Sequence, residues 1–219
     1  TERLRLLERE IRSPRPFLHP SASAGPEADA VLGTYRVLAE HLKIHGVDGL
    51  GALIVSMTRR LSDLLGVYVL AREAGLRITA HAGEWGGPES VRDAINDLGV
   101  ERVGHGVRAI EDLALVDEIA ERGIVLELCP GSNVALGLYK DFRAHPIAEM
   151  LKRGVKVTIS TDDPPFFHTT MTREYEMLHR AFEWDEGVFA QIARTSIEAA
   201  FCDAETKTLI QSRLEQANG

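Results

Sequence analysis

The sequence predicts an α/β protein built around a parallel sheet, and three observations support this class. From Leu76 onward one unit repeats: a short apolar strand, a cluster of polar residues and then an amphipathic helix. A glycine follows each of these helices, which is a common way for a helix to end. The strands alternate with the helices, as they do in a parallel sheet with helical crossovers.

Each element of the repeat can be placed from its apolar pattern. Strands are expected at residues 77–80, 101–103, 124–128 and 155–160. Helices are expected between them at about 89–98, 111–121 and 147–152, followed by Gly99, Gly123 and Gly154. An earlier apolar run at 52–55 is typical of a strand buried on both faces, which brings the expected strands to five. From Thr172 the pattern is wholly helical.

The segment before the repeat has a different character. Its pattern predicts helices at about 27–45 and 64–74, and prolines between residues 14 and 20 interrupt an earlier helical run. We therefore divide the chain into a mostly helical scaffold segment, residues 1–76, and the repeating segment, residues 77–219.

Composition narrows the classes of function. The 219 residues are 44% hydrophobic and 26% charged, which is ordinary for a globular protein. The formal charge of −8 provides no basic surplus for binding a phosphate backbone, so we expect no nucleic-acid partner. No apolar run reaches membrane-spanning length, and the charged N-terminus does not resemble a signal peptide. With two cysteines, too few for a disulfide framework, the chain is expected to be a cytoplasmic enzyme acting on small molecules, with no membrane partner.

Four polar clusters follow the expected strands. HAGE, GHG, CPGSN and STDDPP each begin where a strand ends. Parallel α/β folds assemble their active sites from loops at this end of the sheet. The coincidence of four clusters predicts a functional site there.

The residue types in these clusters suit metal-assisted hydrolysis. His81 and Asp162 are candidate metal ligands from two strand ends, and Glu84 is a candidate proton shuttle. His105 lies between two glycines that permit close approach of a substrate. Asp163 is placed to accept a hydrogen bond from a substrate ring nitrogen.

Simpler interpretations remain for each residue taken alone. A single histidine at a strand end is more often a hydrogen-bonded structural residue than a ligand. The paired aspartates before Pro164 are also compatible with a turn that caps a helix, and Glu84 with a solvated carboxylate. Cys129 is expected to pack as a small apolar residue.

Residues 71–202 closely resemble the C-terminal half of the adenosine/adenine deaminase family. The matching segments are REAGLRITAHAGEWGGPESVRDAI, ERVGHGVRAIED, LELCPGSNVALG, HPIAEMLKRGVKVTISTDDPPFF and ARTSIEAAF. The resemblance implies a parallel (β/α) barrel of the TIM-barrel type with one zinc ion (Zn2+) at the carboxyl ends of the strands. It also implies hydrolytic deamination of a purine at C6.

The resemblance also implies a role for each matched residue. His81 and Asp162 would hold zinc, and Glu84 would protonate the purine ring. His105 would orient the attacking hydroxide, and Asp163 would assist the nucleophile and bind the purine. Gly83 would lie near the substrate.

Two features depart from the family pattern. The family has a His-x-His pair that supplies two more zinc ligands, and this chain contains no His-x-His. Residues 1–76 instead resemble an internal stretch of bacterial phosphoenolpyruvate carboxylase, through LLEREIRSPRPFL, TYRVLAEHLKIHG and GALIVSMTRRLSDLLGVYVLAREAGL. The chain is therefore interpreted as a chimera or recombined fragment whose carboxylase-like part is scaffold.

Three functions stay open from the sequence: a purine deaminase with impaired activity, a catalytically inert chimeric barrel, and a carboxylase-related lyase. Five strands are fewer than the eight that close such a barrel. An open sheet has unpaired edges, so self-association is expected.

Overall fold

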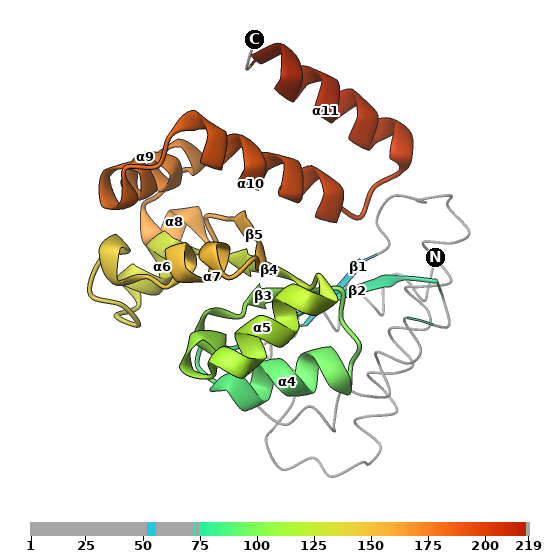
Figure 1. Ribbon diagram of the computed structural model, residues 1–219, viewed down its shortest axis with the longest axis vertical. Helices are drawn as coiled ribbons and strands as arrows, with labels where there is room; N and C mark the ends of the chain where they lie inside the picture. The colour runs from blue at the N-terminus through green and yellow to red at the C-terminus, as the bar shows by residue number, and fades with distance from the viewer. Residues whose placement is uncertain (1–51, 56–71, 73–74, 218–219) are drawn as a thin grey trace, which may run out of the picture.

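The computed structural model describes residues 52–55, 72 and 75–217, and these contain a five-stranded parallel sheet (Figure 1). The strands lie side by side in chain order, and every neighbouring pair is parallel. They are β1 (Ala52–Val55), β2 (Arg77–Ala82), β3 (Arg102–His105), β4 (Val125–Leu128) and β5 (Lys156–Ile159). The α/β class and the five expected strands are confirmed.

Helices connect consecutive strands from β2 onward. The crossover helices are α4 (Pro88–Asn96), α5 (Leu113–Arg122) and α7 (Ile147–Lys152). Four short helices lie in the connections: η2 (Val107–Glu111), α6 (Pro130–Ala135), η3 (Phe142–Ala144) and α8 (Pro164–Phe167). After β5 the chain is helical, as expected, with α9 (Met171–Phe182), α10 (Glu186–Ala199) and α11 (Ala204–Ala217). In Figure 1, α4 and α5 lie together below the strands, and α9 and α10 lie above them.

The two faces of the sheet differ in chemistry because side chains alternate along a strand. One face is apolar and packs with buried side chains of α4, α5 and α7 to form the core. Its row from the strands consists of Ile78, Ala80, Val103, Leu126, Leu128, Val157 and Ile159. The opposite row is polar, since the register aligns Thr79 with Arg102, His81 with Gly104, and Gly104 with Glu127. His81 therefore belongs to the polar row of β2.

Two strands extend further than the sequence predicts. β2 continues to Ala82 and β3 to His105, so both candidate histidines lie in strands and not in the loops after them. α5 begins only at Leu113, because Asp112 accepts hydrogen bonds from the backbone N–H groups of Ala114 and Leu115 and so caps the helix.

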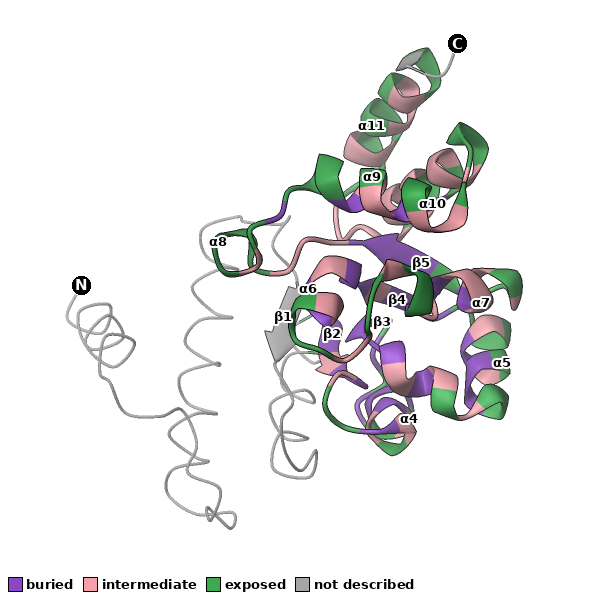
Figure 2. Cartoon of the chain, turned by 90° about the vertical axis from the view of Figure 1, so that its left-hand side faces the viewer, coloured by how far each residue is buried: buried purple, intermediate pink, exposed green. Residues whose placement is uncertain are grey.

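The helices after β5 differ in how deeply they are buried. α10 packs along β5, and α11 contacts α10. Figure 2 shows buried residues in the strands, whereas α11 is drawn as intermediate and exposed throughout. Within the described sheet, β1 and β5 are the edge strands. None of the helices in the described residues is both long enough and apolar enough to span a bilayer.

Several predictions fall on other parts of the chain. The helix predicted at 27–45, and nearly all of that at 64–74, lie outside the described residues. The division of the chain at residues 76 and 77 stays a prediction.

Candidate active site

The ends of β2 and β3 bring two imidazole rings together. The rings of His81 and His105 meet edge to face, with centroids 5.1 Å apart and planes 81° apart. A Cβ at Gly104 would lie 2.2 Å from Cδ2 of His81, so only glycine leaves room for this ring. The sequence suggested that Gly104 opens space for a substrate, whereas the structure shows that it makes room for His81.

Two carboxylates from other strand ends face His105. Its Nε2 atom lies 3.7 Å from Oε2 of Glu84 and 3.9 Å from Oδ2 of Asp162. The same Asp162 oxygen accepts a hydrogen bond of 2.7 Å from the hydroxyl of Ser132, in α6. The loops after β2, β4 and β5 therefore converge on the end of β3.

Backbone strain is concentrated at this point. His105 has φ of 62° and Asp162 has φ of 58°, which is the left-handed region that side-chain-bearing residues rarely adopt. Such a conformation costs on the order of 1–3 kcal/mol and persists where surrounding contacts enforce it, often at functional sites. Both residues were predicted from the sequence as members of the site.

The surroundings change the protonation of two groups. Burial raises the pKa of the Glu84 carboxyl, and the nearby charge of Asp162 raises it further. Burial, helped by His81, lowers the pKa of His105 to about 4, and Asp162 only partly opposes this. Near neutral pH, His105 is therefore neutral, while Glu84 holds a proton more readily than an ordinary glutamate.

Cys129 lies closer to the site than the sequence indicated. Ligand atoms of His105, Cys129 and Asp162 lie within 4.8 Å of one another. Burial is the main cause that raises the pKa of the thiol, and the negative charges of neighbouring carboxylates raise it further. Its Sγ–H donates to the carbonyl of Glu127 at 3.7 Å. Cys129 thus packs as a buried neutral thiol, as expected.

Comparisons with known proteins identify the family to which the chain belongs. The sequence profile described as "Adenosine deaminase" matches residues 33–217. The chain belongs to this family. The match includes residues 33–76, where the carboxylase resemblance was seen, and the comparisons show neither that resemblance nor a chimeric origin.

The similar proteins are purine deaminases and related hydrolases. Adenine deaminases of Rhizobium leguminosarum bv. trifolii and Agrobacterium fabrum are 45% and 42% identical over 190 and 193 residues, which are 87% and 88% of this chain. In both cases the chain spans 58% of the relative's length.

Solved structures show the same fold. An adenine deaminase from Arthrobacter aurescens matches with a TM-score of 0.75 at 31% identity, over 86% of this chain and 57% of that one. An amidohydrolase from Burkholderia ambifaria with bound zinc matches with a TM-score of 0.74 at 26% identity, over 85% and 53%. The parallel sheet is thus part of a (β/α) barrel of the TIM-barrel type.

Two residues predicted for substrate binding lie beside the cluster. Asp163 is exposed and begins α8 through its backbone carbonyl, which accepts hydrogen bonds from the N–H groups of Phe166 and Phe167. Gly83 has φ of 65°, and its N–H donates to the hydroxyl of Ser90 at 2.9 Å. Within the described residues, no hydrogen bond or ion pair joins the side chain of Asp163 to the cluster. The substrate roles of both residues stay predictions.

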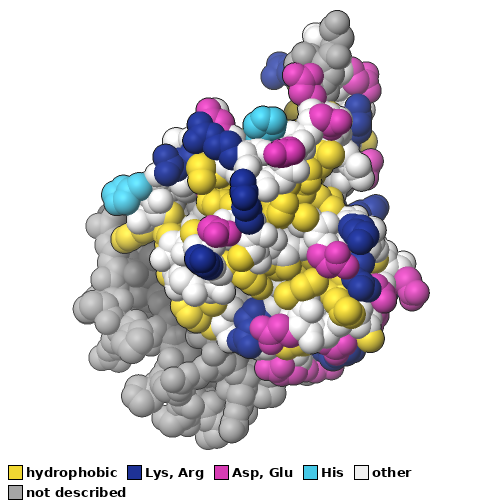
Figure 3. Space-filling view, turned by 60° about the vertical axis from the view of Figure 1, so that its left-hand side comes forward, with side chains coloured by type: hydrophobic (Ala, Val, Ile, Leu, Met, Phe, Trp, Pro, Cys, Tyr) yellow, Lys and Arg dark blue, Asp and Glu magenta, His cyan; other side chains and the backbone are white. Residues whose placement is uncertain are grey.

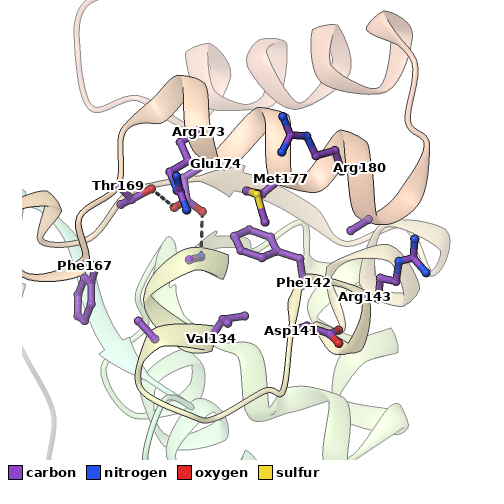
Figure 4. Close-up of a pocket in the computed structure, with 13 residues that line it drawn as sticks. Val134, Asp141, Phe142, Arg143, Phe167, Thr169, Arg173, Glu174, Met177 and Arg180 are labelled. Carbon is purple, nitrogen blue, oxygen red and sulfur yellow. Dashed lines mark hydrogen bonds between the residues drawn. The ribbon is translucent and has the colours of Figure 1, made fainter.

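The sequence analysis did not identify the residues that hold α6 in place beside the site. Glu174, in α9, accepts hydrogen bonds from the N–H of Gly131 at 2.9 Å and the hydroxyl of Thr169 at 2.6 Å, as Figure 4 shows. Burial is the main cause that raises its pKa. This contact anchors α6, which carries Ser132 and Asn133. No sequence signal marks Glu174, since it lies in a helix outside the polar clusters.

A pocket of about 660 Å³ is lined by residues of α6, η3 and α9. Figure 4 shows Phe142 and Met177 within it and three arginines, Arg143, Arg173 and Arg180, around it. Figure 3 shows basic side chains spread among exposed hydrophobic ones on this face of the molecule. The candidate residues at the strand ends do not line this pocket.

Proposed function

We propose that the chain carries the zinc-dependent hydrolytic site of an adenine deaminase. The observation that carries the proposal is the convergence of His81, Glu84, His105 and Asp162 at the carboxyl ends of β2, β3 and β5. Adenine is preferred to adenosine because the similar curated proteins are named adenine deaminases.

His81 and Asp162 are the proposed zinc ligands. Both lie beside His105 and both are partly exposed, so an ion can reach them. Imidazole nitrogen and carboxylate oxygen are donors that catalytic zinc sites use, and the amidohydrolase from Burkholderia ambifaria contains bound zinc. When bound, zinc lowers the pKa of a coordinated water towards neutrality and so supplies the nucleophile.

The remaining residues handle protons and orientation. Glu84, with its raised pKa, donates a proton to a ring nitrogen of the purine. Neutral His105 offers a ring N–H to the oxygen of the attacking water, and Asp163 accepts a hydrogen bond from the purine. The oxygen of water forms a bond to C6, one water proton passes to Glu84 to replace the proton it gave, and the other passes to the exocyclic nitrogen. The bond between C6 and that nitrogen then breaks, C6 becomes a carbonyl carbon, and ammonia leaves.

The ligand set limits the activity that we expect from this chain by itself. Catalytic zinc sites use three protein ligands, whereas the matched residues supply two and the sequence contains no His-x-His. We therefore propose that the isolated chain binds zinc weakly and turns over adenine far below the rate of an ordinary enzyme.

A catalytically inert, chimeric barrel is the second candidate, and it stays a prediction. The carboxylase-related lyase is not favoured by any observation in the described residues. Self-association through the edges of the sheet and a cytoplasmic location stay predictions. Light scattering of the purified chain tests the first of these, and a monomer at every concentration would contradict it.

Equilibrium dialysis against zinc, followed by an assay of ammonia release from adenine, tests the proposed function. We expect up to one zinc per chain, lost in His81→Ala and retained in His168→Ala, a matched change at an exposed histidine. Turnover should depend on zinc and favour adenine over adenosine. Zinc binding that ignores His81→Ala, or none at any concentration, would refute the proposed site. Zinc binding without measurable turnover would support the inert barrel.

A further inference from the structure

A chain of buried polar groups runs from His105 away from the site. The side-chain nitrogen Nδ2 of Asn133 lies 3.5 Å from Nδ1 of His105, and Oδ1 of Asn133 lies 3.2 Å from Nε2 of His145. The chain ends at the backbone N–H of Ile147, which donates to Nδ1 of His145 at 3.2 Å. His105, Asn133 and His145 are 2%, 0% and 2% exposed, so water does not compete for these bonds.

The last hydrogen bond of this network, donated by the backbone of Ile147, fixes the direction of every other hydrogen bond in it. A backbone N–H can only donate, so Nδ1 of His145 must accept. A neutral imidazole that accepts at one nitrogen carries its proton on the other, so Nε2 of His145 donates to the carbonyl oxygen of Asn133. The amide nitrogen of Asn133 then faces His105 and donates to its Nδ1.

The proton of His105 is therefore left on Nε2. This is the nitrogen that faces Glu84 and Asp162, at 3.7 and 3.9 Å. Burial supports the scheme because it keeps the ring of His145 neutral: it lowers the pKa of this histidine to about 3.

We propose that Asn133 and His145 are positioning residues that hold His105 in the tautomer with its proton on Nε2, directed at the carboxylates. A ring nitrogen that carries a proton cannot bind a metal ion, because metal ligands must offer a lone pair. The tautomer thus keeps His105 out of the coordination shell, although it lies within 4.8 Å of Cys129 and Asp162. Its catalytic meaning rests on the proposed function, because there the Nε2–H donates to the attacking oxygen.

The direct test is the tautomer of each histidine, read from long-range 1H–15N correlation spectra of the metal-free chain at pH 7. Both His105 and His145 should carry the proton on Nε2. His105→Gln and His145→Gln assign the signals by removing them. The opposite tautomer at His105, or a mixture of the two, would overturn the proposal.

Asn133→Asp gives the sharpest change. A carboxylate accepts from His145 but cannot donate to His105, so the proton of His105 should move from Nε2 to Nδ1 while His145 keeps its tautomer. Asn96→Asp is the matched control, because Asn96 lies at the end of α4 and accepts a hydrogen bond from Arg122. An unchanged His105 signal in Asn133→Asp, or the same change in Asn96→Asp, would contradict the proposal.

A second pair covers the case in which Asn133→Asp does not fold. His145→Phe keeps an aromatic ring against Tyr139, whose ring centroid lies 5.2 Å away, but removes the donor to Asn133. The amide of Asn133 is then free to turn over, and the tautomer of His105 should become mixed or reversed. His145→Gln restores a donor and should restore the Nε2–H signal of His105. Failure of this rescue would overturn the proposal. None of these spectra needs zinc or adenine, so their failure is distinct from failure of the proposed function.

Discussion

The two ends of the parallel sheet differ in how their charged side chains are paired. Towards the amino ends of the strands, Arg77 makes hydrogen bonds of 3.0 and 2.9 Å to the carboxylate of Glu101. Arg102, the first residue of β3, pairs at 3.1 Å with Glu127, which the register places level with Gly104 further along the sheet. Both guanidinium groups also stack over the ring of Phe201, at 4.1 and 3.7 Å. Charges at this end are paired, although Nε of Arg102 is buried without a hydrogen-bond partner within the described residues.

At the carboxyl ends the carboxylates lack such partners. Within the described residues, the only basic group that pairs with Glu84 or Asp162 is His105, whose lowered pKa leaves it neutral. His105 and Asp162 also have left-handed backbones. The comparison teaches that the amino end of the sheet is built for stability, and that the carboxyl end retains strain and unneutralised charge, as the proposed zinc and substrate site requires.

At neutral pH the largest effect on stability is expected at the amino end. Arg102→Ala removes the partner of Glu127 and the donor to the carbonyl of Ala199, at 3.1 Å, and it should lower the free energy of unfolding by about 2–3 kcal/mol. Arg77→Ala is the control, since its pair is nearly half exposed and should cost about 0.5–1 kcal/mol. Urea titrations measure both. Equal losses would contradict the account of this end.

The free energy of unfolding should fall at acid pH because of His145, a buried histidine. Burial lowers the pKa of His145 to about 3 in the folded state, against an ordinary value of 6.5. The unfolded chain therefore binds more protons below pH 6.5, and stability that is fully present above this pH is lost as the pH falls towards 3. The loss is about 1.4 kcal/mol per pH unit below 6.5 for this residue.

Urea titrations between pH 7 and 4.5 check this dependence. His145→Gln should have a shallower pH dependence than the unaltered chain. His168→Asn, at an exposed residue with left-handed backbone that asparagine tolerates, should leave it unchanged. A pH dependence that His145→Gln does not alter would refute the assignment.

A smaller loss of stability is expected from filling the space beneath His81. Gly104→Ala places a methyl group against the ring and should cost about 1–3 kcal/mol, and zinc binding should weaken because the ring must move. Gly123→Ala is a control for stability alone, because it has left-handed backbone but open space. It should destabilise the chain without changing the affinity for zinc. Unchanged zinc affinity in Gly104→Ala would show that His81 is not a ligand.

The smallest effect on stability is expected at Asp162. Asp162→Asn removes the repulsion between two nearby carboxylates and retains an acceptor for Ser132, so the metal-free chain should be stabilised by about 0.5 kcal/mol or left unchanged. Zinc binding should be lost. A strong destabilisation, measured by urea titration without metal, would mean that Asp162 belongs to the framework and not to the site.

A feature could be predicted from the sequence when it depends on neighbouring positions in the chain, and not when it depends on contacts between residues far apart in the sequence. The strand and helix pattern and the cluster of His81, Glu84, His105 and Asp162 are local signals, since strand ends in a parallel sheet meet at one edge. The role of Gly104 depends on the neighbouring strand, and the sequence suggested a different reason for it. Asn133 stood in a recognised cluster without an assigned role.

His145 and Glu174 could not be found from the sequence at all. His145 reaches Asn133 across 12 positions, and Glu174 reaches Gly131 across 43. Pairing at such separations follows from the packing of α6 against neighbouring segments, which leaves no periodic signal. The carboxylase resemblance, the chimeric origin and the division at residue 76 stay predictions.

X-ray absorption at the zinc edge of the zinc-loaded chain tests the central claim most directly. The account predicts a shell of nitrogen and oxygen atoms that includes an imidazole, with the imidazole signal absent in His81→Ala, which should not bind zinc, and unchanged in Arg102→Ala. Sulfur at about 2.3 Å from zinc would place Cys129 in the shell and contradict the account, as would a spectrum that His81→Ala leaves unaltered.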